Sequence, residues 1–155
     1  MNGMSRIVKT VSSFAFPFVL IYGFYIIAHG HLTPGGGFQG GAVVASGCAM
    51  ILVAYGSIWT MERIKEKDLS IFESLGAIGF IGLAFFGLIF GGYFFKNYIL
   101  EKGFFFNEMA IGASNINTAG VIPLMNFAVG LKVMAGLFAI VLVMAYASSK
   151  KEEDK

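Results

Sequence analysis

Charged side chains and cysteine are both scarce in this sequence of 155 residues. Only 13% of the residues are charged, whereas an average soluble domain has about 25%. Hydrophobic residues make up 57% of the chain, and its mean hydropathy is +0.77. This composition excludes an ordinary soluble domain and indicates one integral membrane domain over residues 1–155. The single cysteine, Cys48, excludes a disulfide within the chain and a cysteine-based metal cluster.

The sequence also lacks the residue patterns of an enzyme active site or a metal centre. It shows no Ser/His/Asp set, no catalytic pair of acidic residues and no metal-ligand spacing. Its two histidines, His29 and His31, are too few ligands for a zinc site. The glycine-rich run that follows them lacks the Lys-Ser/Thr of a phosphate-binding P-loop. We therefore expect no enzyme activity from this chain by itself, no metal, no cofactor and no nucleic-acid partner.

What the sequence does contain is four long apolar stretches, at about residues 8–28, 38–59, 72–95 and 121–146. Each approaches or exceeds the length of about 20 residues that a helix needs to cross a bilayer. Because backbone in lipid must satisfy its own hydrogen bonds, we predict an all-α fold of four transmembrane helices. The first stretch has too long an apolar core for a signal peptide, and no small-residue cleavage site follows it, so we expect it to be retained.

Basic residues gather on one side of these stretches. Eight of them precede the first stretch, separate the second from the third, or follow the fourth: Arg6, Lys9, Arg63, Lys65, Lys67, Lys150, Lys151 and Lys155. The opposite side has only Lys96 and Lys102. The positive-inside rule then places both termini in the cytoplasm of a multi-pass protein of the cell membrane. The connection at 29–37 and an extramembrane segment at 96–120 face outside.

A glycine-rich run joins the first two apolar stretches. It contains Pro34, Gly35, Gly36, Gly37, Gly40 and Gly41. Proline stops the continuation of a helix, and glycine readily adopts positive φ angles. We therefore expect a tight loop here, partly re-entrant into the membrane. Two tasks fit this loop equally well: lining an ion path, or locking the packing of the helices.

The third stretch is dense in glycine, which predicts close helix packing. Gly87 and Gly91 form a GxxxG pair, and Gly76 lies nearer the start of the stretch. Small residues let helices in lipid approach closely enough for van der Waals contact to hold them together. We expect these three glycines to face neighbouring helices; a glycine hinge is the alternative.

Lys132 is the one charge that lies deep in a predicted span. It stands about 11 residues, or roughly 16 Å, from the outer end of the fourth helix. A charge there costs about 2.5–3.5 kcal/mol to insert, so it should face a polar interior. Its helical neighbours are small: Ala128, Ala135, Gly136 and Ala139. We expect Glu73 to lie at the wrong depth, so the partner of Lys132 is water or a carboxylate on another subunit. Lys132 serves either an ion or proton relay or a structural charge pair.

Three further polar residues are candidates for ion translocation together with Lys132. Glu73 opens the third stretch, where a carboxylate either suits the helix dipole or serves a cytoplasmic ion entrance. His31, at the outer end of the first stretch, either anchors the loop or helps protons arrive, since an imidazole exchanges its proton near neutral pH. Asn126 makes the start of the fourth stretch more polar.

Three segments resemble a known family in the expected order, over about Val8 to Tyr146. The run Gly30–Gly41 resembles the GHxxPGGGFxGG signature of the B subunit of Mrp-type Na+/H+ antiporters, the MnhB-like family. The segment Glu73–Ala77 resembles the start of that family's third span. The segment Pro123–Val133 resembles the fourth-span pattern in many members.

This resemblance implies a four-helix subunit that works only in a larger assembly. Its partners would be other small membrane subunits and large antiporter-like subunits related to respiratory complex I, all within a lipid bilayer. The same module occurs in membrane-bound hydrogenases and related sulfur-reducing complexes. Some antiporter members have an acidic residue near the position of Asn126 and no lysine at that of Lys132, so this chain favours the redox-complex branch. The open functions are ion translocation, a purely structural scaffold, or a free-standing antiporter.

Overall fold

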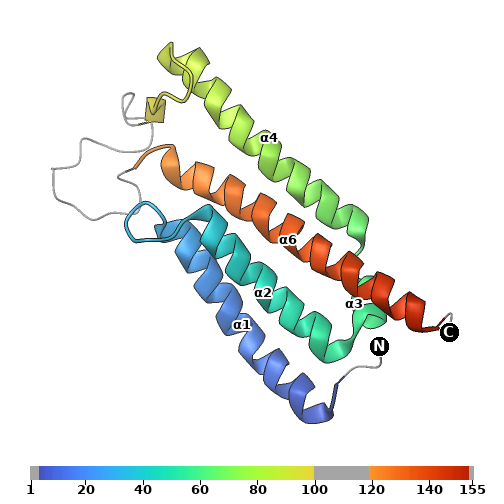
Figure 1. The fold of residues 1–155 in the computed structure, drawn as a ribbon. Coiled ribbons are helices and arrows are strands. Elements are labelled where there is room, and N and C mark those ends of the chain that lie inside the picture. Colours follow the sequence, from blue (N-terminus) through green and yellow to red (C-terminus); the bar gives the residue numbers. More distant parts are fainter. Residues whose placement is uncertain (1–3, 100–118, 154–155) are drawn as a thin grey trace.

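The structure, a computed structural model, describes residues 4–99 and 119–153, and the regular structure within them is helical. Its helices are α1 (Arg6–His29), α2 (Gly37–Tyr55), α3 (Ser57–Arg63), α4 (Glu66–Gly91) and α6 (Ile122–Glu153) (Figure 1). Within these residues, four helices are long and apolar enough to cross a membrane: α1, α2, α4 and α6. The expected all-α fold with four membrane-length helices is therefore confirmed.

The second apolar stretch, expected as one helix over 38–59, is divided at Gly56. α2 ends at Tyr55, and the next residue, Gly56, has φ 94° and ψ 160°. Such a backbone conformation is open essentially to glycine alone. The short α3 follows, and the hydroxyl oxygens of Ser57 and Ser149 of α6 lie 2.6 Å apart. The expected continuous helix is therefore wrong beyond Tyr55, because the backbone turns at Gly56.

α4 starts before the expected residue 72, and α6 extends past the expected residue 146. Glu66 and Asp68 occupy the first turn of α4, where negative charge stabilises the positive end of the helix dipole. Because these residues are charged, a helix boundary predicted from hydropathy leaves out the first turns of α4. At its other end α4 stops before Gly92, which is left-handed with φ 78°. The expected extramembrane segment at 96–120 falls mainly on residues outside those described.

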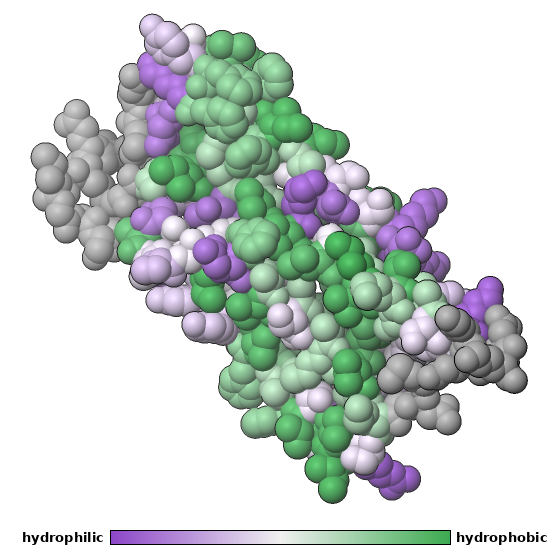
Figure 2. Space-filling model, viewed as in Figure 1, coloured by the Kyte–Doolittle hydropathy of each residue, from purple (hydrophilic) through white to green (hydrophobic). Residues whose placement is uncertain are grey.

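The long helices pack in the order α1, α2, α6, α4 and form an open layer (Figure 1). α1 begins and α6 ends at the same end of this layer. An open layer leaves much of each helix uncovered: Phe18 of α1 is 60% exposed and Ile78 of α4 is 66% exposed. Figure 2 shows hydrophobic side chains along the length of the layer. Such a surface suits lipid or other membrane proteins, because apolar area in water is unfavourable.

Glycines at the start of α2 set the spacing of α1, α2 and α6. A Cβ on Gly40 would lie 2.7 Å from the carbonyl oxygen of Gly23 in α1. A Cβ on Gly41 would lie 2.7 Å from the carbonyl oxygen of Gly130 in α6, and Gly37 is packed just as closely against α6. The expectation that Gly37, Gly40 and Gly41 belong to the loop is wrong. They are buried in α2, because the helix begins directly after Gly36.

The connection between α1 and α2 is short and covers residues 30–36. The backbone N–H groups of Leu32 and Thr33 donate to the carbonyl oxygen of His29 and close a turn at the end of α1. Gly35 and Gly36 have φ angles of 150° and 133°. A side chain would strain the backbone at both positions. The glycine-rich run thus serves the turn with two residues and helix packing with three others.

Gly87 and Gly91 lie close to the chain that leaves α4. A Cβ on Gly87 would lie 2.7 Å from the backbone nitrogen of Lys96, and one on Gly91 would lie 2.6 Å from Cδ of the same lysine. The nearest atoms to this GxxxG pair therefore belong to the turn after α4. The expectation that the pair faces a neighbouring helix is wrong for Gly87 and Gly91. The pair is small because the chain folds back directly over it.

We expect Gly41→Ala to loosen the contact between α2 and α6 and to lower the thermal stability of the protein in detergent. The added Cβ meets a backbone oxygen, so the two helices must move apart, and such overpacking costs about 1–3 kcal/mol. Gly82→Ala is the matched control, because a Cβ there meets no atom within 4 Å. Thermal unfolding in detergent compares the two variants, and equal midpoints would contradict this account of α2.

Candidate functional site

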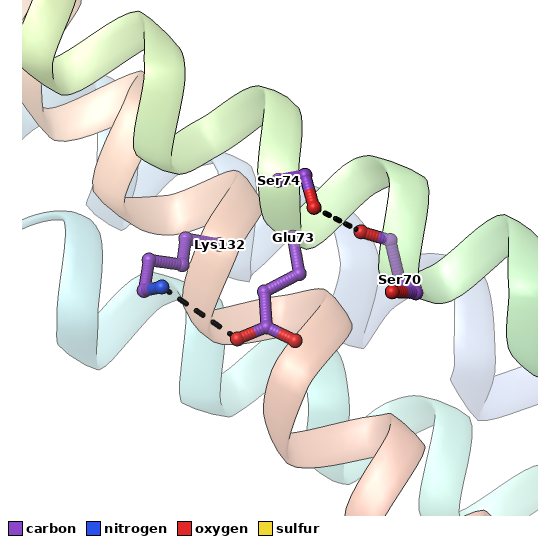
Figure 3. A network of polar contacts seen from close by, with 4 residues as sticks. All are labelled: Ser70, Glu73, Ser74 and Lys132. Atoms are coloured by element: carbon purple, nitrogen blue, oxygen red, sulfur yellow. Dashed lines mark hydrogen bonds and ion pairs between the residues drawn. The ribbon is translucent and has the colours of Figure 1, made fainter.

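Lys132 and Glu73 form an ion pair between α6 and α4. The Nζ atom of Lys132 lies 3.6 Å from Oε1 of Glu73 (Figure 3). Lys132 stands about 15 Å along α6 from Ile122, and Glu73 stands about 10 Å along α4 from Glu66. Both charges therefore lie well inside membrane-length helices. The expectation that Glu73 lies at a different level from Lys132 is wrong, because α4 runs antiparallel beside α6 and brings the two side chains to within 3.6 Å.

Small residues bring the two helices close enough for this pair to form. A Cβ on Gly76 would lie 2.7 Å from the backbone nitrogen of Lys132 and 2.7 Å from the carbonyl oxygen of Ala128. One turn further along α6, a Cβ on Gly136 would lie 3.5 Å from the carboxyl carbon of Glu73. Gly76, Ala128 and Gly136 thus lie at the contact between α4 and α6, and the carboxylate rests over Gly136.

The serines beside Glu73 are hydrogen-bonded within their own helix. The hydroxyl of Ser74 donates to the carbonyl oxygen of Ser70 over 2.8 Å (Figure 3). Both serines lie on α4, and the hydroxyl of Ser74 is directed along that helix towards Ser70. Within the part of the chain that the structure describes, the pair therefore consists of one ammonium and one carboxylate. Its separation of 3.6 Å is longer than a hydrogen bond to a charged group, which is about 2.7–2.9 Å.

The pair is only half covered by its own chain. The side chains of Lys132 and Glu73 are 50% and 43% exposed. Beside Lys132 lies a groove of about 280 Å³, lined by Gly76, Ala77, Phe80, Ile81, Val129 and Lys132. In water an exposed pair of this kind contributes about 0–1 kcal/mol. In a bilayer a charge at such a depth costs about 2.5–3.5 kcal/mol, so polar groups from outside the chain must complete the site.

Asn126 belongs to a second polar group, next to the connection between α1 and α2. A Cβ on Gly30 would lie 2.9 Å from Nδ2 of Asn126, and one on Gly36 would lie 3.6 Å from its Oδ1. Oε1 of Gln39 is also near Gly36, at 3.8 Å from that Cβ position. Gln39 was not among the expected candidates, although a polar residue in an apolar stretch is a visible signal.

His31 has two buried ring nitrogens without a hydrogen-bond partner among the described residues. The same holds for Nδ2 of Asn126 and Nδ1 of His29. The ring of His29 stacks on that of Tyr25, with the centroids 4.4 Å apart. Each unsatisfied buried group costs about 1–3 kcal/mol. Asn126 precedes Lys132 by about 9 Å along α6, so of the four expected candidates the structure joins only Lys132 and Glu73.

Membrane-length helices in an open layer are typical of a multi-pass membrane protein, and here two of them carry an ion pair at their contact. Residues 7–139 match the family model described as a domain related to the MnhB subunit of Na+/H+ antiporter. Because this match covers most of the chain, the protein belongs to that MnhB-related family. The resemblance seen in the sequence is thereby confirmed.

Two sequence relatives and one solved structure extend this finding. The chain is 35% identical over 143 residues to an uncharacterized protein of Methanocaldococcus jannaschii. This alignment covers 88% of this chain and 52% of that protein. It is 32% identical over 78 residues to the B subunit of the Na+/H+ antiporter of Bacillus subtilis. That alignment covers 50% of this chain and 46% of the relative. The chain thus spans about half the length of these relatives.

The solved structure is that of the membrane-bound sulfane sulfur reductase, an archaeal respiratory membrane complex. One of its chains is similar to this protein with a TM-score of 0.73 and 32% sequence identity. The similarity covers 91% of this chain and 58% of that chain. The arrangement of the long helices is therefore shared with a component of a multisubunit membrane complex.

We expect the charges of Lys132 and Glu73 to be coupled in the folded protein. Lys132→Met and Glu73→Gln each leave one charge without its partner in a medium of low dielectric constant, whereas the double variant leaves none. The double variant should therefore be more stable than the sum of the single effects predicts, by about 0.5–3 kcal/mol. Thermal midpoints of the purified protein give this coupling, and additive effects would contradict the pairing.

Proposed function

We propose that this chain is a non-catalytic membrane subunit of a multisubunit, Mrp-like cation (Na+)/proton antiporter module. We further propose that the module belongs to an energy-converting respiratory complex of the membrane-bound hydrogenase and sulfur-reducing type. In it, the chain contributes to ion translocation and packs against neighbouring subunits. The ion pair between Lys132 and Glu73 is the observation that carries this proposal. Membership of the MnhB-related family and the likeness to a respiratory membrane complex support it.

The geometry of the pair suits a site that responds to a passing cation. The carboxylate of Glu73 attracts either the ammonium of Lys132 or a cation that comes near it. At 3.6 Å the two side chains attract each other without a short hydrogen bond that would lock them together. A sodium ion or a proton at Glu73 weakens the hold on Lys132, and its departure restores that hold. Because charges interact more strongly at low dielectric constant, a small displacement changes the energy appreciably.

The proposed orientation follows from the basic residues. They place both termini in the cytoplasm, and the connection between α1 and α2 then lies at the outer surface. There, His31 and Asn126 would supply polar groups near the outer end of α6, about 9 Å along that helix from Lys132. Their buried nitrogens, which have no hydrogen-bond partner among residues 4–99 and 119–153, are suited to hold water, through which protons arrive.

A purely structural scaffold is the second candidate function. Its supporting observation is the close packing at Gly40, Gly41 and Gly76, together with a pair of charges that neutralise each other within one chain. In that case the pair serves assembly alone. A free-standing Na+/H+ antiporter is a variant of the first function, and the likeness to the antiporter protein of Bacillus subtilis favours it.

We expect Lys132→Ala to reduce sodium and proton transport by the complex to background while the complex still assembles. Lys132→Arg keeps the charge but holds its proton, so a relay in which Lys132 releases a proton should fail in this variant too. Ion fluxes in sealed vesicles measure both variants, and Lys65→Ala, which lies outside the long helices, is the control. Loss of assembly in Lys132→Ala would favour the scaffold. Normal transport by Lys132→Arg would exclude a proton carrier and leave a fixed charge.

A tag on this chain should bring down the whole assembly under mild solubilisation. We expect large antiporter-like subunits together with iron–sulfur proteins related to hydrogenases, because the chain is similar to a component of an archaeal respiratory membrane complex. Mass spectrometry of the purified material identifies them. Antiporter-like subunits without redox proteins would indicate a free-standing antiporter. A folded, stable chain without any partner would contradict the multisubunit proposal.

A further inference from the structure

We propose that the groove beside Lys132 is the docking site for a transmembrane helix of a neighbouring subunit. We further propose that this helix presents an uncharged hydroxyl or amide side chain, from Ser, Thr, Asn or Gln, to the pair of Lys132 and Glu73. The proposal rests on the proposed function in that it requires the chain to work inside a membrane complex. Beyond that function, this docking site specifies the surface that contacts the neighbouring subunit and the type of side chain that the neighbour contributes.

The exposure of the two charges requires an occupant other than lipid. Half of the Lys132 side chain and 43% of that of Glu73 are uncovered, and the lysine stands about 15 Å along α6 from its first residue. A lysine stem brings its ammonium to the interface only when it starts near a helix end. Acyl chains offer no hydrogen-bonding atom to either group. Water in a cavity or a polar group from another protein segment can meet this need, and the small residue and apolar wall beside Lys132 favour a protein segment.

Charge balance decides the chemistry of that polar group. Lys132 and Glu73 already neutralise each other, so a further carboxylate or ammonium would leave one uncompensated charge in a medium of low dielectric constant. The ammonium still offers N–H donors, and the carboxylate still offers acceptor lone pairs. A hydroxyl or an amide serves both, since each can accept from one group and donate to the other. An uncharged polar side chain is therefore the best complement.

The shape of the groove suits the close approach of a helix. Its α4 side includes Ala77, whose small side chain lets another backbone come near. Ile81, which is 54% exposed, offers an apolar wall next to this small residue. In a bilayer an apolar helix surface is satisfied as well by lipid as by protein. Helices therefore associate there through small residues and hydrogen-bonding polar groups.

A second groove provides the contrast. It has a volume of about 320 Å³ and is lined by Phe24, Ile27, Leu75, Gly76, Gly79, Phe127, Ala128, Gly130, Leu131 and Met134. No charged residue lines it, so acyl chains can fill it without any loss of hydrogen bonding. Of these two grooves, only the one that contains Lys132 therefore calls for a protein partner.

Photo-crosslinking in the intact complex tests the proposal. Ile81→p-benzoylphenylalanine places the reactive group at the groove of Lys132, and Phe127→p-benzoylphenylalanine places it at the apolar groove. We expect the first to crosslink a different membrane subunit, at a helix with Ser, Thr, Asn or Gln within one turn of the labelled residue. We expect the second to label lipid. Mass spectrometry of the crosslinked peptides identifies the target.

Several results would overturn the proposal. They are crosslinks from position 81 to lipid alone, to a second copy of this chain, or to a helix that presents Asp, Glu, Lys or Arg at that level. If the bulky label disturbs assembly, Ala77→Cys with a short thiol crosslinker probes the same groove. Because crosslinking does not depend on transport, a transporting complex labelled only by lipid would contradict the docking site and leave the proposed function intact.

Discussion

The close contact between α4 and α6 at Gly76 is the constraint on which the charged site depends. A side chain at this position would meet the backbone of Lys132 and Ala128, so a larger residue would separate the helices and with them the two charges. The distance of 3.6 Å between Lys132 and Glu73 is thus set by packing and not only by attraction. In lipid, where helices gain little from apolar contact, such small-residue contacts hold them together.

The same principle organises the rest of the layer around α6. Gly41 of α2 meets Gly130 on α6, and Gly40 of α2 meets Gly23 on α1. Each contact is made by backbone against backbone, which leaves the large apolar side chains free to point outwards. The chain therefore has tight internal contacts and a wide apolar surface at the same time. This combination is expected of a subunit whose remaining surface is covered by lipid and by other proteins.

The long helices were predictable because hydropathy and length report directly on the bilayer. Their ends were not, since charged first-turn residues such as Glu66 lie outside an apolar window although they stabilise the helix. A helix expected to start at residue 72 has Glu73 at its very end, so hydropathy offered no reason to pair Glu73 with Lys132. The glycines at positions 37, 40 and 41 were misplaced for a related reason. Composition marks a loop, but whether a glycine serves a turn or a helix contact depends on which residues face it.

Pairing within the chain changes what ion translocation would require of this subunit. An isolated Lys132 would call for a carboxylate on a neighbour, whereas the pair with Glu73 is already neutral and calls only for hydrogen bonds. A neutral pair is also a site that a cation can enter by replacing the ammonium, with a net change of one charge. The cost of that charge falls when polar groups are already in place. The partner that completes the groove therefore helps to set how easily an ion disturbs the pair.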